Sequence, residues 1–175
     1  DLKVLDAGCG TGVITRTIYN IAKEKGFTGL MFNAFDLTQH MLDIFQKRIA
    51  EHDLQHVQLA QADVLKPDSL PRDWSEYDLI VCSALLEYIP ADQIGDALNH
   101  FKQRLKRDGR LLIFVTKRSL VTTWTGKLFW GTHLFEEKEM ENLLHDIGFG
   151  KMERLKLSYG WAKHIIVLEA QQAEA

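Results

Sequence analysis

The stretch that decides the fold is Val4-Leu5-Asp6-Ala7-Gly8-Cys9-Gly10-Thr11-Gly12, an apolar run that passes into a glycine-rich loop. The apolar run predicts a strand, and the three glycines let the backbone turn tightly and approach a ligand without a Cβ atom in the way. The next residues have helical spacing, with an apolar face formed by Val13, Ile14, Thr17, Ile18 and Ile21. The sequence therefore predicts a strand, a ligand-binding loop and a helix in direct succession.

Short β-like runs and longer helical runs alternate along the rest of the chain. The predicted strands cover residues 2–6, 30–35, 57–60, 77–82, 111–115, 152–157 and 165–168. Helical spacing predicts further helices around residues 41–49, 94–105 and 136–146. This alternation is typical of a doubly wound α/β domain with a mainly parallel sheet that ends in an antiparallel hairpin.

Glycine and proline mark the ends of these elements. An Asp108-Gly109 turn is expected to close the helix over 94–105, and Gly148 is expected to cap the helix over 136–146. Pro67 and Pro71 bracket a loop in which the helix between the third and fourth strands is short or missing.

Composition limits the class of protein. The chain has 175 residues, of which 46% are hydrophobic and 26% charged, and this predicts one soluble domain over residues 1–175. Because the chain opens directly on a strand, we expect an N-terminal segment to precede it. The net charge of −3 gives no case for a nucleic acid partner. Cys9 and Cys82 are too few for a disulfide framework, which favours a reducing, cytoplasmic location.

The sequence shows no pattern of a membrane-spanning helix or of a metal site. No apolar stretch approaches the roughly 20 residues that a membrane-spanning helix needs. The seven histidines show no metal-site spacing, since His52 and His56 lie where the second helix is already ending, and no metal is expected.

Three carboxylates follow neighbouring predicted strands at their carboxyl ends, where open α/β sheets bind ligands. Asp6 precedes the glycine loop, Asp36 ends the second strand and Asp63 follows the third. A ligand with a cationic amino acid end, a ribose and an adenine suits them. A dinucleotide loop would need its third glycine at position 13, which is Val13, and Asp6 would repel a pyrophosphate.

Several stretches together resemble class I S-adenosylmethionine-dependent methyltransferases. Residues 6–12 resemble the first motif of that family, Asp36-Leu37 with Met41 its second, and residues 61–64 its third. The fourth motif is matched by residues 77–83 and 86–90, and later segments by residues 105–114 and 133–149. The resemblance implies a Rossmann-like seven-stranded sheet of order 3-2-1-4-5-7-6 with strand 7 antiparallel. It also implies S-adenosyl-L-methionine as cofactor and S-adenosyl-L-homocysteine as product.

The resemblance assigns a role to each matched residue. Gly8, Cys9 and Gly10 would pack against the methionine part of the cofactor, with Asp6 and the Ser83 backbone near its ammonium group. Asp36 would hold the ribose hydroxyls. Leu37, Met41 and Val64 would sandwich the adenine, and Asp63 would accept a hydrogen bond from its amine.

The function expected is methyl transfer to a small or lipid-like acceptor. An NAD-type oxidoreductase and a non-catalytic binding protein with the same fold are the alternatives. Glu87, Tyr88 and His133 are candidates for a base, but no catalytic residue is assigned. The aromatic segment Lys117 to Phe135, with Trp124, Phe129 and Trp130, is either ordinary core or a wall over the acceptor.

Overall fold

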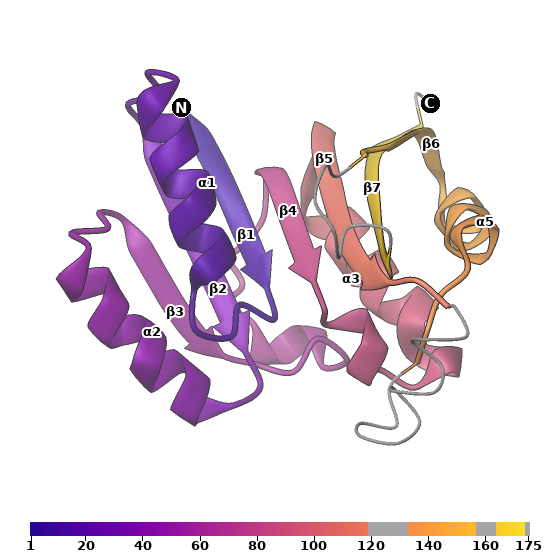
Figure 1. Cartoon of the computed structure of the whole chain (residues 1–175), viewed down its shortest axis with the longest axis horizontal. Helices are drawn as coiled ribbons and strands as arrows, with labels where there is room; N and C mark the ends of the chain where they lie inside the picture. Colours follow the sequence, from indigo (N-terminus) through magenta and orange to yellow (C-terminus); the bar gives the residue numbers. More distant parts are fainter. Residues whose placement is uncertain (119–132, 157–163, 174–175) are drawn as a thin grey trace.

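The computed structural model describes residues 1–118, 133–156 and 164–173 and contains one seven-stranded sheet (Figure 1). The strands are β1 (Leu2–Ala7), β2 (Leu30–Asp36), β3 (Val57–Gln61), β4 (Tyr77–Ser83), β5 (Leu105–Thr116), β6 (Phe149–Arg154) and β7 (Ile165–Gln172). Their order is β3-β2-β1-β4-β5-β7-β6. β1 to β5 are parallel, and β7 is antiparallel to both β5 and β6. The predicted order and direction are confirmed.

Four α-helices are described. They are α1 (Val13–Glu24), α2 (Gln39–Glu51), α3 (Ile94–Arg104) and α5 (Glu137–Ile147). Single 3-10 turns are formed by η1 (Pro67–Ser69), η2 (Leu86–Tyr88) and η3 (Ala91–Gln93). The connection from β3 to β4 thus contains no α-helix and only the short 3-10 turn η1, as the two prolines predict.

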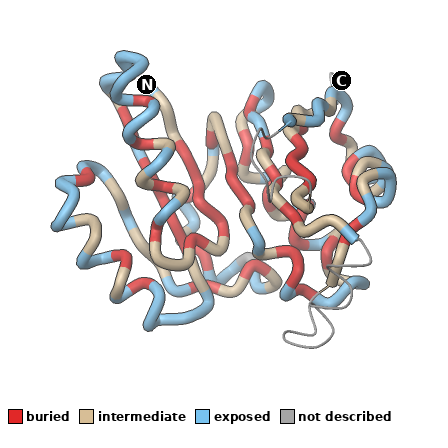
Figure 2. The backbone as a smooth tube through the Cα atoms, in the orientation of Figure 1, coloured by how far each residue is buried: buried red, intermediate tan, exposed pale blue. Residues whose placement is uncertain are grey.

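Neighbouring residues of the central strands belong to two separate cores, one on each face of the sheet. In β1, Val4 packs with residues of α1 and α2, whereas Leu5 packs with residues of α3 and α5. β4 divides in the same way between Val81 and Ile80. Figure 2 shows the resulting pattern, with buried strands inside and helices exposed on their outer sides. Because both faces are covered, apolar residues predominate in the central strands.

The orientation of α1 differs from the prediction. The helix buries Thr15, Tyr19 and Ala22. Of the predicted apolar face, Ile14 and Ile18 pack partly against the core, but Val13 and Ile21 are half exposed. The physical reason is polar: Asp6 accepts hydrogen bonds from the Thr15 backbone N (3.0 Å) and Oγ1 (2.6 Å), and these bonds turn the threonine side of the helix toward the sheet.

The Asp108-Gly109 pair does not form the predicted turn between helix and strand. α3 ends at Arg104, and β5 begins at once with Leu105 opposite Tyr77. The register then shifts, so that Arg110 lies opposite Leu79. The intervening residues form an irregularity inside β5. A Cβ atom on Gly109 would lie 2.5 Å from the carbonyl oxygen of Tyr77, so the close approach of the two strands requires glycine.

The last predictions concern the cap of the final helix, the aromatic segment and membrane-spanning helices. Gly148 caps α5 with a left-handed φ of 96°, as predicted. Lys117 and Phe135 are joined by an isolated bridge, and Phe135 is buried in the core. Trp124, Phe129 and Trp130 lie outside the described residues. Within the described part of the chain, no helix is long and apolar enough to cross a membrane.

Candidate functional site

A cavity of about 590 Å³ lies at the carboxyl ends of β1, β2 and β4. Eight of the ten predicted site residues line it, namely Asp6, Gly8, Cys9, Gly10, Asp36, Leu37, Met41 and Ser83. The topology explains why they meet, since parallel strands β2, β1 and β4 are neighbours and their loops leave the same edge of the sheet.

Asp63 and Val64 are not part of the cavity lining. Val64 is buried in the core beneath α3 and α5. Asp63 accepts a hydrogen bond from the Leu65 backbone N (3.0 Å) and forms an ion pair with Lys66 (3.3 Å). Both residues therefore have local partners, and their predicted contacts with adenine stay a prediction.

The glycine loop is held in a left-handed course. Gly8, Gly10 and Gly12 have φ of 70°, 51° and 81°, a region that L side chains rarely adopt. A Cβ atom on Gly12 would overlap the ring of Phe45 in α2, so this glycine serves packing. A Cβ atom on Gly10 would meet no atom within 4 Å, so the backbone of this residue borders open space in the cavity.

Asp6 is the buried acid of the site, with 1% of its surface exposed. Thr15 donates to one carboxylate oxygen, Oδ2, and the other, Oδ1, has no hydrogen-bond partner in the part of the chain that the structure describes. Burial raises the pKa of this carboxyl from 3.8 to about 6, against the opposing effect of the bonds from Thr15. A cationic ligand group beside Oδ1 would satisfy the atom and favour its charged form.

Asp36 connects the loop to the end of β2. Its Oδ2 accepts a hydrogen bond from the Gly10 backbone N, and its Oδ1 accepts one from the Thr38 backbone N, both at 2.9 Å. Each carboxylate oxygen has two lone pairs, so the side chain can still accept hydrogen bonds from a ligand. Asp36 thus fixes the shape of the loop and presents acceptors at the cavity.

Apolar side chains form the rim of the cavity. Leu37 and Tyr88 are each 65% exposed, and Val13 is 52% exposed. Exposed large hydrophobic residues gathered at one place indicate an interaction surface. The rim can therefore bind the flat or apolar parts of a ligand.

Sequence reasoning missed seven residues of the lining. They are Thr11, Val13, Ile14, Thr38, Ala84, Leu85 and Tyr88. Each lies in the glycine loop, just after it, or within six residues of the end of a predicted strand, so applying the carboxyl-edge rule to every loop would have found them. Tyr88 was named only as a candidate base. Ala84 has a left-handed φ of 53°, which no pattern in the sequence signals.

The cysteines and histidines give no sign of a nucleophile or a metal site. Burial raises the pKa of the Cys9 and Cys82 thiols, which disfavours a thiolate nucleophile at either position. The Arg16 guanidinium contacts the His52 ring at 2.8 Å. No three histidine, cysteine or acidic side chains are arranged for a metal ion in the part of the chain that the structure describes.

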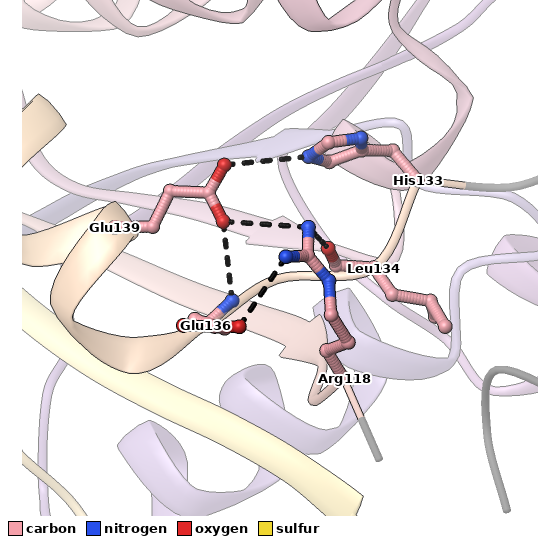
Figure 3. A network of polar contacts seen from close by, with 5 residues as sticks. All are labelled: Arg118, His133, Leu134, Glu136 and Glu139. Atoms are coloured by element: carbon pink, nitrogen blue, oxygen red, sulfur yellow. Dashed lines mark hydrogen bonds and ion pairs between the residues drawn. The ribbon is translucent and has the colours of Figure 1, made fainter. Parts of the chain in front are cut away.

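His133 lies in a polar network at the start of α5 (Figure 3). Its Nε2 is 3.9 Å from Glu139 Oε1, and Arg118 contacts both Glu136 (3.3 Å) and Glu139 (3.5 Å). Arg118 also donates a hydrogen bond to the Leu134 carbonyl (2.9 Å). His133 itself does not line the cavity, and of the three candidate bases only Tyr88 does.

Comparison with known proteins gives close agreement in fold. The structure of the citrinin polyketide synthase CMeT domain matches with a TM-score of 0.79 at 17% identity over 99% of this chain and 47% of that one. Magnesium protoporphyrin IX methyltransferase from Synechocystis, solved with bound S-adenosyl-L-homocysteine (SAH), matches with a TM-score of 0.74 at 20% identity. The match covers 98% of this chain and 74% of that one.

Curated relatives are similar in sequence over part of their length. Malonyl-[acyl-carrier protein] O-methyltransferase from Halalkalibacterium halodurans is 32% identical over 113 residues, which are 65% of this chain and 38% of that protein. Ubiquinone biosynthesis O-methyltransferase from Haemophilus ducreyi is 27% identical over 119 residues, which are 67% of this chain and 47% of that protein. The chain thus spans less than half the length of these two relatives.

A family model described as a methyltransferase domain matches residues 4–109, which contain most of β1, all of β2 to β4 and α3, and the whole cavity lining. The match favours the methyltransferase interpretation of the glycine loop over the dinucleotide alternative. The sheet order, with β7 antiparallel at its end, agrees with it. The chain belongs to the methyltransferase domain family and has the fold of the class I methyltransferases.

Proposed function

We propose that the chain binds S-adenosyl-L-methionine in the cavity at the carboxyl ends of β1, β2 and β4, and transfers its methyl group to a small-molecule acceptor. The observation that carries the proposal is Asp6 Oδ1, a buried carboxylate oxygen at the cavity with no hydrogen-bond partner among the described residues. Buried polar atoms are seldom left unpaired. The ammonium group of the cofactor supplies the missing partner and the opposite charge.

The rest of the lining fits the other parts of the cofactor. The open space at Gly10 gives the methionine chain room against bare backbone. Asp36, with lone pairs to spare, accepts the ribose hydroxyls. Leu37 and Met41 are exposed apolar side chains that can cover a flat base. A cavity of about 590 Å³ lies within the range usual for cofactor sites.

The chemistry needs little from charged side chains. The cofactor supplies an electrophilic methyl group on a sulfonium centre. The protein's part is to orient the two reactants and to exclude water, effects that can contribute much of the rate enhancement of such a displacement. Asp6 and Asp36 anchor the cofactor at two points, and the apolar rim removes water from the reacting end.

For the acceptor we infer a molecule with an apolar or lipid-like body. The Val13 side chain and the Tyr88 ring are large apolar groups that are exposed at the mouth of the cavity. The names of the two curated relatives, a malonyl-[acyl-carrier protein] O-methyltransferase and a ubiquinone biosynthesis O-methyltransferase, are consistent with small acceptors.

Calorimetric titration of the chain with S-adenosyl-L-methionine, S-adenosyl-L-homocysteine (SAH) and NADH tests the proposal. We expect the first two to bind and NADH not to bind. Asp6→Asn should lower the affinity for SAH by about 10- to 100-fold, because it removes a hydrogen bond to a charged group. Binding of NADH alone, or unchanged SAH affinity in Asp6→Asn, would overturn it. Tight SAH binding without methyl transfer to any tested acceptor would instead support a non-catalytic relative.

A further inference from the structure

The glycine loop is the part of the cavity lining with the greatest conformational freedom, because three of the five residues from Gly8 to Gly12 are glycines. A ligand that meets a freely moving loop has to order it on binding, and the loss of conformational entropy lowers its affinity. Tight binding therefore requires that other elements hold the loop in place before the ligand enters.

The strand β2 holds the first half of the loop. The Cys9 backbone N donates a hydrogen bond to the Phe35 carbonyl, and the Gly10 backbone N donates one to Asp36 Oδ2, both at 2.9 Å. Both acceptors belong to the last two residues of β2. The position of Cys9 and Gly10 is thus fixed by the neighbouring strand of the sheet.

The second half of the loop needs a different support, because the carbonyl of Thr11 lies outside the hydrogen bonds of α1. The helical bonds begin one residue later, with the Arg16 backbone N donating to the Gly12 carbonyl at 3.1 Å. The Thr15 backbone N, four residues after Thr11, donates to Asp6 Oδ2 instead. A donor for the Thr11 carbonyl therefore has to come from another element.

Arg48, near the end of α2, supplies this donor. Its Nη1 donates hydrogen bonds to the carbonyl oxygen (3.0 Å) and to Oγ1 (2.7 Å) of Thr11, which is 37 residues away along the chain. The guanidinium forms no ion pair with a carboxylate in the part of the chain that the structure describes. Hydrogen bonds from a charged donor are stronger than those between neutral groups, so this contact restrains Thr11 firmly.

The spacing of three residues explains how one helix reaches both the cavity and the loop. Met41, Phe45 and Arg48 are four and three residues apart, which places them along one face of α2. Met41 lines the cavity, and the ring of Phe45 lies against Gly12. Arg48 continues the same face onto Thr11. The helix that follows Asp36 therefore also closes over the far half of the glycine loop.

We propose that Arg48 is a positioning residue for the cofactor, whose two hydrogen bonds to Thr11 hold the second half of the glycine loop in the binding conformation. Arg48 does not line the cavity, whereas Thr11 does, so Arg48 acts through Thr11. The inference rests on the proposed function and adds a supporting residue to the same site. Because one nitrogen makes both bonds, a lysine ammonium can replace it, whereas a methionine side chain cannot.

Calorimetric titration with SAH tests the effect of Arg48 on binding. Arg48→Met should weaken SAH binding at least tenfold, because the loop loses both bonds and has to be ordered by the ligand. Arg48→Lys should bind SAH within threefold of the parent. Lys47→Met is the matched control, since Lys47 is the adjacent basic residue of α2 and its side chain is exposed. It should bind SAH within twofold of the parent.

Amide hydrogen exchange in the ligand-free chain separates positioning from a general structural role. In Arg48→Met, exchange at the Gly10 and Gly12 amides should become at least fivefold faster relative to amides of β4 and β5. Arg48→Lys should restore the slower exchange. A residue that only stabilised the fold would instead speed exchange in β4 and β5 as much as in the loop.

Four results overturn the proposal. They are unchanged SAH affinity in Arg48→Met, an equal loss in Arg48→Lys, an equal loss in Lys47→Met, and loop exchange that speeds up no more than exchange in β4 and β5. Failure of the parent to bind SAH would count against the proposed function instead. The exchange measurement needs no ligand, so it would still decide whether Arg48 holds the loop.

Discussion

Asp6 is a buried acid whose titration links the stability of the fold to pH. Its pKa of about 6 lies above the ordinary 3.8, so the folded chain disfavours the charged form. Folding therefore binds a proton between these two values, and this contribution to stability is lost as the pH rises through 6. A shift of about two pKa units corresponds to roughly 3 kcal/mol. Asp6→Asn should accordingly raise the free energy of unfolding at pH 7 by about 1–3 kcal/mol, measured by urea unfolding.

The same titration predicts how cofactor affinity depends on pH. Asp6 must be charged to pair with an ammonium group, so affinity for SAH should be flat above pH 6 and fall by up to tenfold per pH unit below it. Calorimetry between pH 5 and pH 7 measures this. Asp6→Asn is the control and should show a flat profile. An equally flat profile in the parent would mean that Asp6 does not contact the ammonium group.

Asp36 has two functions that one pair of variants can separate. Asp36→Ala removes the acceptors for both the ribose and the Gly10 backbone N, and should weaken SAH binding by about 1.5–3 kcal/mol. Asp36→Asn keeps one oxygen for the loop and should have a milder effect. Asp43→Ala, a neighbouring exposed carboxylate in α2 that bonds Gln39, should bind like the parent. If both Asp36 variants bind SAH like the parent, the ribose assignment is wrong.

Gly10 requires a substitution that respects its backbone. Gly10→Val would place a β-branched residue at a φ of 51° and strain the loop whatever the space around it. Gly10→Asn is better, because asparagine tolerates this region, and its side chain would enter the cavity. We expect it to fold and to lose most SAH affinity, by calorimetry. Gly26→Asn, at a φ of 83° with equally open surroundings, should fold and should bind SAH like the parent. Parent-like SAH binding by Gly10→Asn would contradict a cofactor at this point.

At the level of elements, α5 shows clear end signals. Glu136 and Glu139 form a reciprocal capping box at its start, and Gly148 ends it in the left-handed region. Gly148→Ala should lower the free energy of unfolding by about 1–2 kcal/mol, because the left-handed conformation is costly for alanine. Gly95→Ala in α3 is the matched control, since its Cβ would make an ordinary 3.8 Å contact with Leu143. It should raise the free energy of unfolding by up to about 1 kcal/mol.

Neither glycine variant should change the affinity for SAH, because α3 and α5 contribute no residue to the cavity lining. Urea unfolding and calorimetry on the same samples check both statements. Loss of SAH binding in Gly148→Ala would show that the cavity depends on the packing of α5.

For the whole molecule, the arrangement predicts where a bound ligand acts. SAH should slow amide hydrogen exchange in residues 8–15, 36–41 and 83–88, which border the cavity. A second cavity of about 430 Å³, lined by residues that include Tyr19, Lys23 and His56, lies at the amino ends of β2 and β3 and is an internal control. Exchange through local opening there and in β6 and β7 should not change, whereas amides that exchange only through global unfolding should slow throughout the sheet. At 100 times its dissociation constant, SAH should add about 2.7 kcal/mol to the stability.

Slower local opening in β6 and β7 would contradict a site confined to the carboxyl edge. Slowing centred on Tyr19 and His56 would move the site to the second cavity.

The sequence by itself determined most of the strands and helices, their order along the chain and most of the residues of the candidate site. Apolar runs and glycines are local signals, so the strands of the sheet, the glycine loop and the cap at Gly148 could be predicted from neighbours in the chain. The family resemblance supplied the sheet order, and the carboxyl-edge rule brought Asp6 and Asp36 to one place. These parts depend on short-range chemistry and on one general property of parallel sheets.

Only the tertiary structure decided the features that depend on partners far apart in the chain. Thr15, and not the apolar pattern, sets the buried side of α1, because a buried carboxylate needs its hydrogen bonds more than a half-exposed isoleucine needs burial. Gly109 became part of β5 because the Tyr77 backbone lies against it. The carboxylate of Glu87 is positioned by Thr116, 29 residues away along the chain, which donates to one of its oxygens; the other oxygen has no partner among the described residues. Pairing and its absence are properties of the folded chain, and no local pattern encodes them.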